Sequence, residues 1–257
     1  MTGVFQFLIE GVSALYIGHS LVSPVLPEMM HDLLDAPVEM QIINGAPLQM
    51  QWTEGEHAQG VNARTWLPDH PIGTLVMTER VPVGPTIEYH DSAGYAEKWL
   101  DLARQGNPQV QSWLYQTWDD MDPGSTEPWR ARILADLPKW QQILDQVNSD
   151  LPPGAQPMRM LPVGLGMVRL HDAAAAGEVP GAQSIRDFFV DSIHPSPAGG
   201  FYYIAMINYA ALTGKDPTGL PRQLSGLYGP YPKVPKDQAA VLQRLAWETV
   251  QAYPKAD

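Results

Sequence analysis

The repeated alternation of short apolar runs with helical patterns is the feature that most limits how this chain can fold. Each run is five to eight residues long, the length of a strand buried on both faces, and stretches with helical spacing separate the later runs. Parallel strands need a crossover between them, usually a helix. This order therefore predicts a three-layer α/β/α sandwich around a mostly parallel five-stranded sheet. The expected strands are residues 13–17, 38–43, 73–78, 110–117 and 158–163.

The expected helices differ in length and in character. Asp91 offers an N-cap to a helix that ends at Gly106, and Pro138 should kink a longer helix over 127–147. The stretch 201–212 is apolar almost all round, so its helix should be buried. Further helices are expected over 62–67, 165–176 and 238–252.

Length, charge and cysteine content limit the function classes. A chain of 257 residues is expected to form one domain (1–257), with a core over 13–213 and a C-terminal extension over 214–257 that ends in a helix. The formal charge of −12 repels polyanions, so we expect no nucleic-acid partner. Cysteine is absent, which excludes disulfides, thiolate metal sites and a cysteine nucleophile.

The sequence predicts neither a membrane span nor a signal peptide. The apolar stretch 4–22 contains Glu10 and His19 among other polar residues, which makes it too polar for the ~20 residues of a hydrocarbon core. A signal peptide begins with basic residues, whereas the first Lys or Arg here is Arg64. We therefore expect a soluble or already mature chain, in the cytoplasm, the periplasm or the cell exterior.

The first candidate for chemistry follows the first expected strand, in Gly18-His19-Ser20-Leu21. A serine on a strand-to-helix turn faces the sheet edge where ligands bind in open α/β folds. Its N–H lies near a helix start, where it can stabilise an oxyanion. A serine at such a place is also a common helix N-cap, so the motif alone leaves both interpretations open.

The second candidate lies near the other end of the chain, in Asp191-Ser192-Ile193-His194-Pro195. An acid three residues before a histidine can project to the same side of a turn. Asp191 can then accept from one imidazole nitrogen and leave the other free as a general base. The alternative is that His194 packs or caps at the entrance of the next helix and that Asp191 is an ordinary loop acid.

Together the two segments resemble the SGNH (GDSL-type) hydrolase family. That family has a Gly-Asp/Asn-Ser-Leu-like block after its first strand and an Asp-x-x-His block before its terminal helix, and the similarity in order and spacing extends over about 15–212. The resemblance implies a flavodoxin-like three-layer fold, with Ser20 as nucleophile, His194 as base and Asp191 as its orienting partner. His19 replaces the usual acid or amide at a position that mainly shapes the turn.

The resemblance also implies an oxyanion hole. The family uses the N–H of its serine, here Ser20, and that of a glycine after the second strand. Gly45 is at the corresponding position in this chain. An equal alternative is that Gly45 only allows the backbone to turn there and donates to no oxyanion. The third donor is usually an asparagine in a Gly-x-Asn block, which this chain lacks. Asn44 or Arg80 could replace it, whereas an ionised Glu79 would repel an oxyanion.

The remaining candidates concern the substrate pocket, metals and cofactors. We expect His19, Glu79 and Trp118 beside the substrate, although tryptophans more often serve core packing. The pairs His90-Asp91 and His171-Asp172 lack the further histidines of a metal site, so no metal is expected. No complete phosphate-binding glycine loop occurs, and no cofactor is implied.

The sequence therefore favours a serine esterase or deacetylase that forms an acyl-enzyme on Ser20, with a small-molecule or carbohydrate ester as substrate. One alternative is a non-catalytic domain of the same fold that binds carbohydrate or an acyl ligand, because the asparagine block is missing. Another is acyl transfer to an acceptor other than water.

Overall fold

A six-stranded sheet forms the centre of the molecule, which the computed structural model describes over residues 13–253. Its strands are β1 (Ala14–Gly18), β2 (Val38–Ile42), β3 (Gln59–Gly60), β4 (Thr74–Met77), β5 (Gln111–Tyr115) and β6 (Arg159–Leu161). They lie in the order β3-β2-β1-β4-β5-β6, and all neighbours are parallel except β2 and β3. The five predicted strands are thus present, and the sixth is a two-residue edge strand too short to give a periodic pattern.

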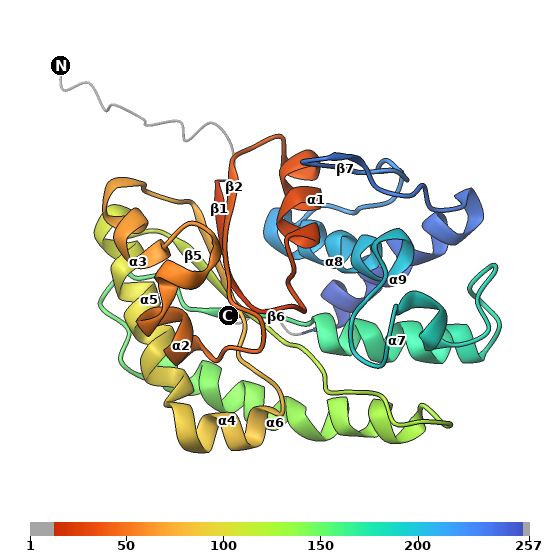
Figure 1. Ribbon diagram of the computed structural model, residues 1–257, viewed down its shortest axis with the longest axis horizontal. Coiled ribbons are helices and arrows are strands. Elements are labelled where there is room, and N and C mark those ends of the chain that lie inside the picture. The colour runs from red at the N-terminus through yellow and green to blue at the C-terminus, as the bar shows by residue number, and fades with distance from the viewer. Residues whose placement is uncertain (1–12, 254–257) are drawn as a thin grey trace.

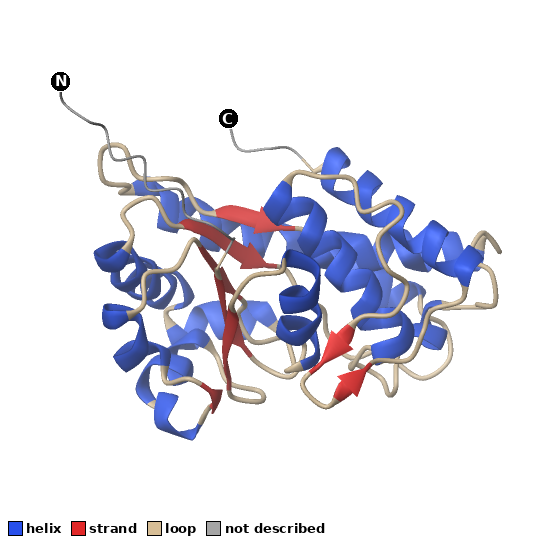
Figure 2. Cartoon of the chain, turned by 90° about the horizontal axis from the view of Figure 1, so that it is seen from above, coloured by secondary structure: helices blue, strands red, loops and turns tan. Residues whose placement is uncertain are grey.

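Helices cover both faces of this sheet (Figures 1 and 2). In Figure 1, α1, α7, α8 and α9 lie on one side of the strands, and α2, α3 and α5 lie on the other. The predicted three-layer α/β fold is therefore confirmed. The helices are α1 (Val25–Leu34), α2 (Leu48–Thr53), α3 (Ala63–Trp66), α4 (Val83–His90), α5 (Ser92–Gly106), α6 (Glu127–Ser149), α7 (Val163–Ala175), α8 (Tyr202–Thr213) and α9 (Lys236–Ala252).

The central strand β1 is buried on both faces because each helical layer packs against it. Tyr16 belongs to the hydrophobic cluster that contains the buried residues of α1, α8 and α9, whereas Leu15 and Ile17 belong to the cluster of α2 and α5. This alternation follows from the period of two along a strand. A strand covered on both faces has to be apolar throughout, which is why β1 was recognisable in the sequence.

Two local features add detail to the expected helices. Asp91 occupies the N-cap position of α5 and makes no side-chain cap hydrogen bond. It adopts a left-handed conformation (φ 47°) between α4 and α5, where a single such residue redirects the chain. Pro138 lies inside α6, and the helix continues through it to Ser149. The first half of α6 packs with the α1 side of the sheet and the second half with the α5 side.

The C-terminal segment packs into the same core as the rest of the domain. Ala239, Leu242, Leu245 and Ala246 of α9 are buried in the cluster that also contains α8. Between α8 and α9, a small hairpin of β7 (Ser225–Gly226) and β8 (Gly229–Pro230) lies against α1. In the part of the chain that the structure describes, no helix combines the length and the apolar character that a membrane crossing requires. Residues 4–12 of the apolar N-terminal stretch lie outside the described residues.

Candidate active site

Ser20 lies on a tight turn directly after β1. Gly18 ends the strand, and a Cβ there would lie 2.7 Å from Val22 Cγ2 and 2.8 Å from Thr78 Cγ2, so the close packing requires glycine. The backbone N–H groups of Val22 and Ser23 both donate to the His19 carbonyl and close the turn. The cap position of α1 is Pro24. Ser20 is therefore not a helix N-cap, and its half-buried side chain is free to make other contacts.

The structure brings Ser20, His194 and Asp191 together in one hydrogen-bond chain. Ser20 Oγ lies 2.9 Å from His194 Nε2, although the two residues are 174 positions apart. His194 Nδ1 lies 2.7 Å from Asp191 Oδ2. An Nδ1–H that donates to the carboxylate leaves the Nε2 lone pair to accept from the serine hydroxyl. This is the arrangement that a nucleophile, a base and an orienting acid require.

The Asp191 carboxylate is fixed by its own loop. Its Oδ1 accepts hydrogen bonds from the backbone N–H groups of Ile193 (2.8 Å) and His194 (2.7 Å), while Oδ2 faces the imidazole. Partial burial raises the pKa of Asp191, but these hydrogen bonds outweigh it and lower the pKa to about 2. The carboxylate therefore stays ionised, and able to orient His194, throughout the ordinary pH range.

The segment after β5 holds this loop in place. Trp118 Nε1 donates to the Ile193 carbonyl (3.0 Å), the Met121 N–H donates to the Ser192 carbonyl (2.8 Å), and the Ser192 hydroxyl donates to Asp120 Oδ1 (2.6 Å). Trp118 is only 2% exposed and packs edge-on against Phe189. In this structure the Trp118 ring is an internal support of the loop that carries Asp191 and His194, and its place beside the substrate stays a prediction.

The two other residues expected beside the substrate are also buried. His19 is 3% exposed, and its Nε2 lies 3.1 Å from the Glu79 carbonyl. Burial, together with the nearby Arg80 charge, lowers the pKa of His19 to about 4, so the ring is neutral. Glu79 is fully buried, and its Oε1 accepts from the N–H groups of Leu48 (3.1 Å) and Arg80 (2.7 Å). Both side chains lie beneath the site and support its loops.

The candidate oxyanion donors lie on the loops that flank Ser20. β1 pairs with β2 (Gly18 with Ile42) and with β4 (Ile17 with Met77), so Asn44 and Arg80 lie on the loops that follow the two strands on either side of β1. Gly45 follows with φ 67°, a conformation that favours glycine. Within residues 13–253, the backbone N–H groups of Ser20 and Gly45 and the Asn44 amide have no hydrogen-bond acceptor.

Gln51 is a supporting residue that sequence analysis did not single out. It is fully buried, and its Nε2 donates to the carbonyls of Gly18 and Ile43, which end β1 and begin the loop after β2. The side chain thereby fixes the distance between the Ser20 turn and the Gly45 loop. No motif indicates such a residue, because its partners are backbone groups from two separate segments.

The His-Asp pairs serve structural contacts. His171 lies between the Thr126 hydroxyl and Asp172, at 2.9 Å from each, and so joins the start of α6 to α7. His90 contacts Arg80 and Gln49. Among the described residues, no three His, Asp or Glu side chains are grouped so as to hold a metal ion.

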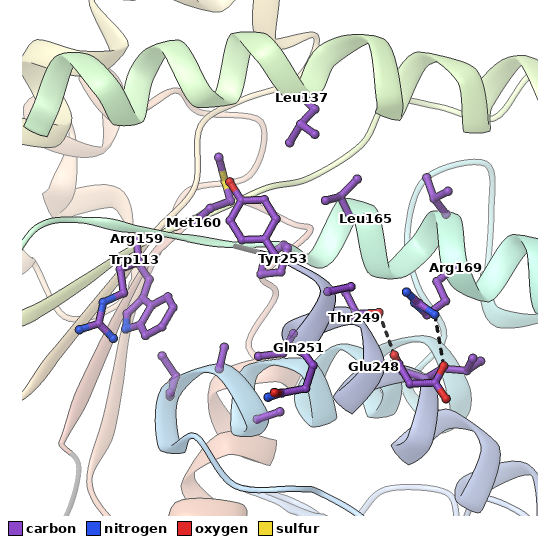
Figure 3. A pocket seen from close by; sticks show the side chains of 18 of the residues that line it. Trp113, Leu137, Arg159, Met160, Leu165, Arg169, Glu248, Thr249, Gln251 and Tyr253 are labelled. Atoms are coloured by element: carbon purple, nitrogen blue, oxygen red, sulfur yellow. Dashed lines mark hydrogen bonds and ion pairs between the residues drawn. The ribbon is translucent and has the colours of Figure 1, made fainter. Parts of the chain in front are cut away.

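A large cavity of about 1590 Å³ lies away from Ser20, between α6, α7, α9 and the free edge of β6 (Figure 3). Its lining includes Trp113, Met160 and Tyr253 but no histidine, and none of Ser20, Asp191 and His194. The cavity therefore lacks the hydroxyl–imidazole pair that acyl transfer requires.

Comparisons with known proteins find distant structural likeness and no match in sequence. No family model matches the chain, and no curated protein matches it. Among solved structures, a crystal structure of a carbohydrate esterase family 3 from Talaromyces cellulolyticus is similar, with 14% sequence identity and a TM-score of 0.44. The similarity covers 76% of this chain and 92% of that chain.

Proposed function

We propose that this protein is a serine hydrolase of carboxylic esters, with Ser20 as the nucleophile. The observation that carries the proposal is the Ser20–His194–Asp191 hydrogen-bond chain, with 2.9 Å and 2.7 Å between successive polar atoms. The resemblance to SGNH hydrolases favours small acyl groups, including acetyl groups on carbohydrates, as the part that is removed.

In this proposal His194 takes the hydroxyl proton at Nε2 while Ser20 Oγ attacks the acyl carbonyl. The tetrahedral intermediate collapses when His194 returns that proton to the leaving alkoxide, which leaves the acyl group on Ser20. Water then attacks the acyl-enzyme with the same base, and the carboxylic acid is released. Asp191 keeps the imidazole in the required tautomer and stabilises its charged form during both steps.

The oxyanion is stabilised by the backbone N–H groups of Ser20 and Gly45, and we assign the third donor to the Asn44 amide. These groups have no acceptor within the described residues, and Asn44 lies on the loop after β2, the strand that pairs with β1 next to Ser20. Arg80 is less suited to this role because His90 contacts its guanidinium group. Loss of one such donor typically costs about 10²–10³ in rate, so Asn44→Ala offers a secondary test.

Hydrolysis of p-nitrophenyl acetate by purified Ser20→Ala protein tests the proposal. We expect kcat to fall by at least about 10³-fold, because the nucleophile and its base act as a unit. Ser149→Ala, an exposed serine at the end of α6, is the matched control and should keep wild-type kcat. Circular dichroism should give the same spectrum for all three proteins.

A fluorophosphonate probe separates the proposed hydrolase from the non-catalytic alternative. Labelling that requires Ser20 indicates an activated hydroxyl, whereas an unlabelled wild-type protein with no esterase activity would contradict the proposal. Acyl transfer is recognised by product analysis: an added alcohol or sugar acceptor would become acylated in preference to water.

A further inference from the structure

Arg80 lies on the loop that follows β4, the strand that pairs with β1 before Ser20. It lies two residues beyond Thr78, whose N–H donates to the Ile17 carbonyl and continues the pairing of β1 with β4. The loops with Ser20 and Arg80 therefore leave the sheet at the same edge. His19, next to Ser20, also contacts the carbonyl of Glu79, next to Arg80. The two loops therefore run side by side at the carboxyl end of the sheet.

The Arg80 guanidinium group is held by neutral partners. Its Nη2 lies 3.2 Å from His90 Nε2, and His90 Nδ1 lies 2.8 Å from Gln49 Oε1. This chain fits a neutral imidazole that accepts from Arg80 and donates to Gln49. His90 ends α4 and Gln49 lies on α2, so two helices fix the position of the cation without reducing its charge.

Among the described residues, no carboxylate forms an ion pair with Arg80. Within residues 13–253, no Asp or Glu oxygen lies within 4.0 Å of its side chain, whereas Arg130 forms a two-pronged pair with Asp172 at 2.6 and 2.7 Å. The adjacent Glu79 carboxyl is turned into the protein, where it accepts from two backbone N–H groups. In a chain with 28 acidic and 16 basic residues, a half-buried arginine without an acidic partner is a ready site for an anion.

We propose that Arg80 forms a subsite for a carboxylate on the ester, so that the enzyme prefers substrates with a negative charge near the scissile bond. This inference rests on the proposed function. The guanidinium group contacts His90 at the end of α4, whereas Ser20 Oγ contacts His194 in the loop that precedes α8. An anion bound there is displaced from the reacting carbonyl, as a second group of the substrate would be. A guanidinium group matches a carboxylate in geometry and charge.

Paired esters that differ in one carboxylate test the subsite. For charge on the acyl side, 4-nitrophenyl hydrogen succinate is compared with 4-nitrophenyl butyrate, and for charge on the alcohol side, an O-acetylated glucuronate is compared with the same O-acetylated glucose. We expect wild-type kcat/KM to favour the anionic member of at least one pair by about tenfold, the worth of one charged hydrogen bond. Arg80→Ala should abolish this preference, and Arg80→Lys should retain part of it. Arg64→Ala, an exposed arginine on α3, should keep it in full.

The possible failures are distinguishable. The subsite would be overturned if the wild-type kcat/KM values of the anionic and neutral esters were nearly equal in both pairs. It would also be overturned if Arg80→Ala lowered kcat/KM equally for both members of each pair. If the wild-type protein hydrolyses none of the four esters, the proposed function fails. Calorimetry then tests the anion site by itself, with glucuronate and succinate as ligands and Ser20→Ala protein as the reference. If either ligand binds this protein and the binding is lost in the Ser20→Ala/Arg80→Ala double variant, the anion site is supported. If neither ligand binds Ser20→Ala protein, the anion site is overturned.

Discussion

The Glu79 carboxyl joins two loops that border Ser20. Its Oε1 accepts from the N–H of Leu48, at the start of α2 behind the Gly45 loop, and from the N–H of Arg80 after β4. The side chain is fully buried, and burial raises its pKa. Glu79 thus acts as a positioning residue: it keeps the candidate oxyanion donors and the Arg80 subsite at a fixed separation.

Glu79→Gln and Glu79→Ala should differ sharply in kcat and in the free energy of unfolding. Glutamine retains an acceptor oxygen for both N–H groups, so we expect kcat on p-nitrophenyl acetate within about threefold of wild type. Alanine leaves the two N–H groups without their acceptor. It should lower kcat by about 10-fold or more and the free energy of unfolding by about 1–3 kcal/mol. Steady-state kinetics and urea unfolding measure both effects, and equal behaviour of the two variants would contradict the positioning role.

The pH dependence of stability gives a second measurement on Glu79. A carboxyl with a raised pKa in the folded protein favours folding below its ordinary pKa, and this contribution is lost as the pH rises and the unfolded chain ionises. Glutamine does not ionise. The stability of Glu79→Gln relative to wild type should therefore increase from about pH 4 to pH 7. A difference that is constant over this range would indicate that Glu79 is not desolvated.

At the scale of elements, the loop with Asp191 and His194 depends on the segment after β5. Trp118, Asp120 and Met121 each make a hydrogen bond to residues 192–193, between Asp191 and His194. The Asp191–His194 loop therefore has its partners outside its own sequence neighbourhood, and its geometry depends on how β5 ends.

Trp118→Phe should lower kcat by about tenfold with little change in KM, because a small displacement of a base from its nucleophile slows the chemical step more than substrate binding. The phenyl ring retains most of the packing against Phe189 but lacks the N–H that bonds Ile193. Trp66→Phe, a half-buried tryptophan on α3, is the control and should keep wild-type kcat. Steady-state kinetics on p-nitrophenyl acetate measure both variants. A wild-type kcat in Trp118→Phe would mean that the remaining contacts position the loop.

The sequence predicted the strands and the long helices because burial on a periodic face determines them. α5, α6 and α9 begin and end within about two residues of their expected bounds. The short helices α2 and α4 were missed. α4 contains Gly84 and Pro85, which disfavour a helix locally, and it is held by the burial of Val83 and Thr86. The burial of the Glu79 and Trp118 side chains was not predictable for the same reason, because packing between segments decides where a side chain points.

At the scale of the whole molecule, α9 completes the core on the α1 side of the sheet. Its buried residues pack with those of α8, which is apolar on nearly every side and needs cover from outside the sheet. The loop with Asp191 and His194 directly precedes α8. The position of His194, the proposed base, is therefore linked to a helix that lies more than forty residues further along the chain.

Leu242→Ala tests whether α9 and the sheet unfold as one unit. Leu242 is fully buried, so the truncation should lower the free energy of unfolding by about 2–5 kcal/mol, whereas Ala240→Gln on the exposed face of α9 should change it by less than about 0.5 kcal/mol. Because one core joins both parts, urea curves followed by circular dichroism and by esterase activity should shift together and coincide. If residues 214–257 were instead an independent extension, activity would persist after α9 had unfolded and the two curves of Leu242→Ala would separate.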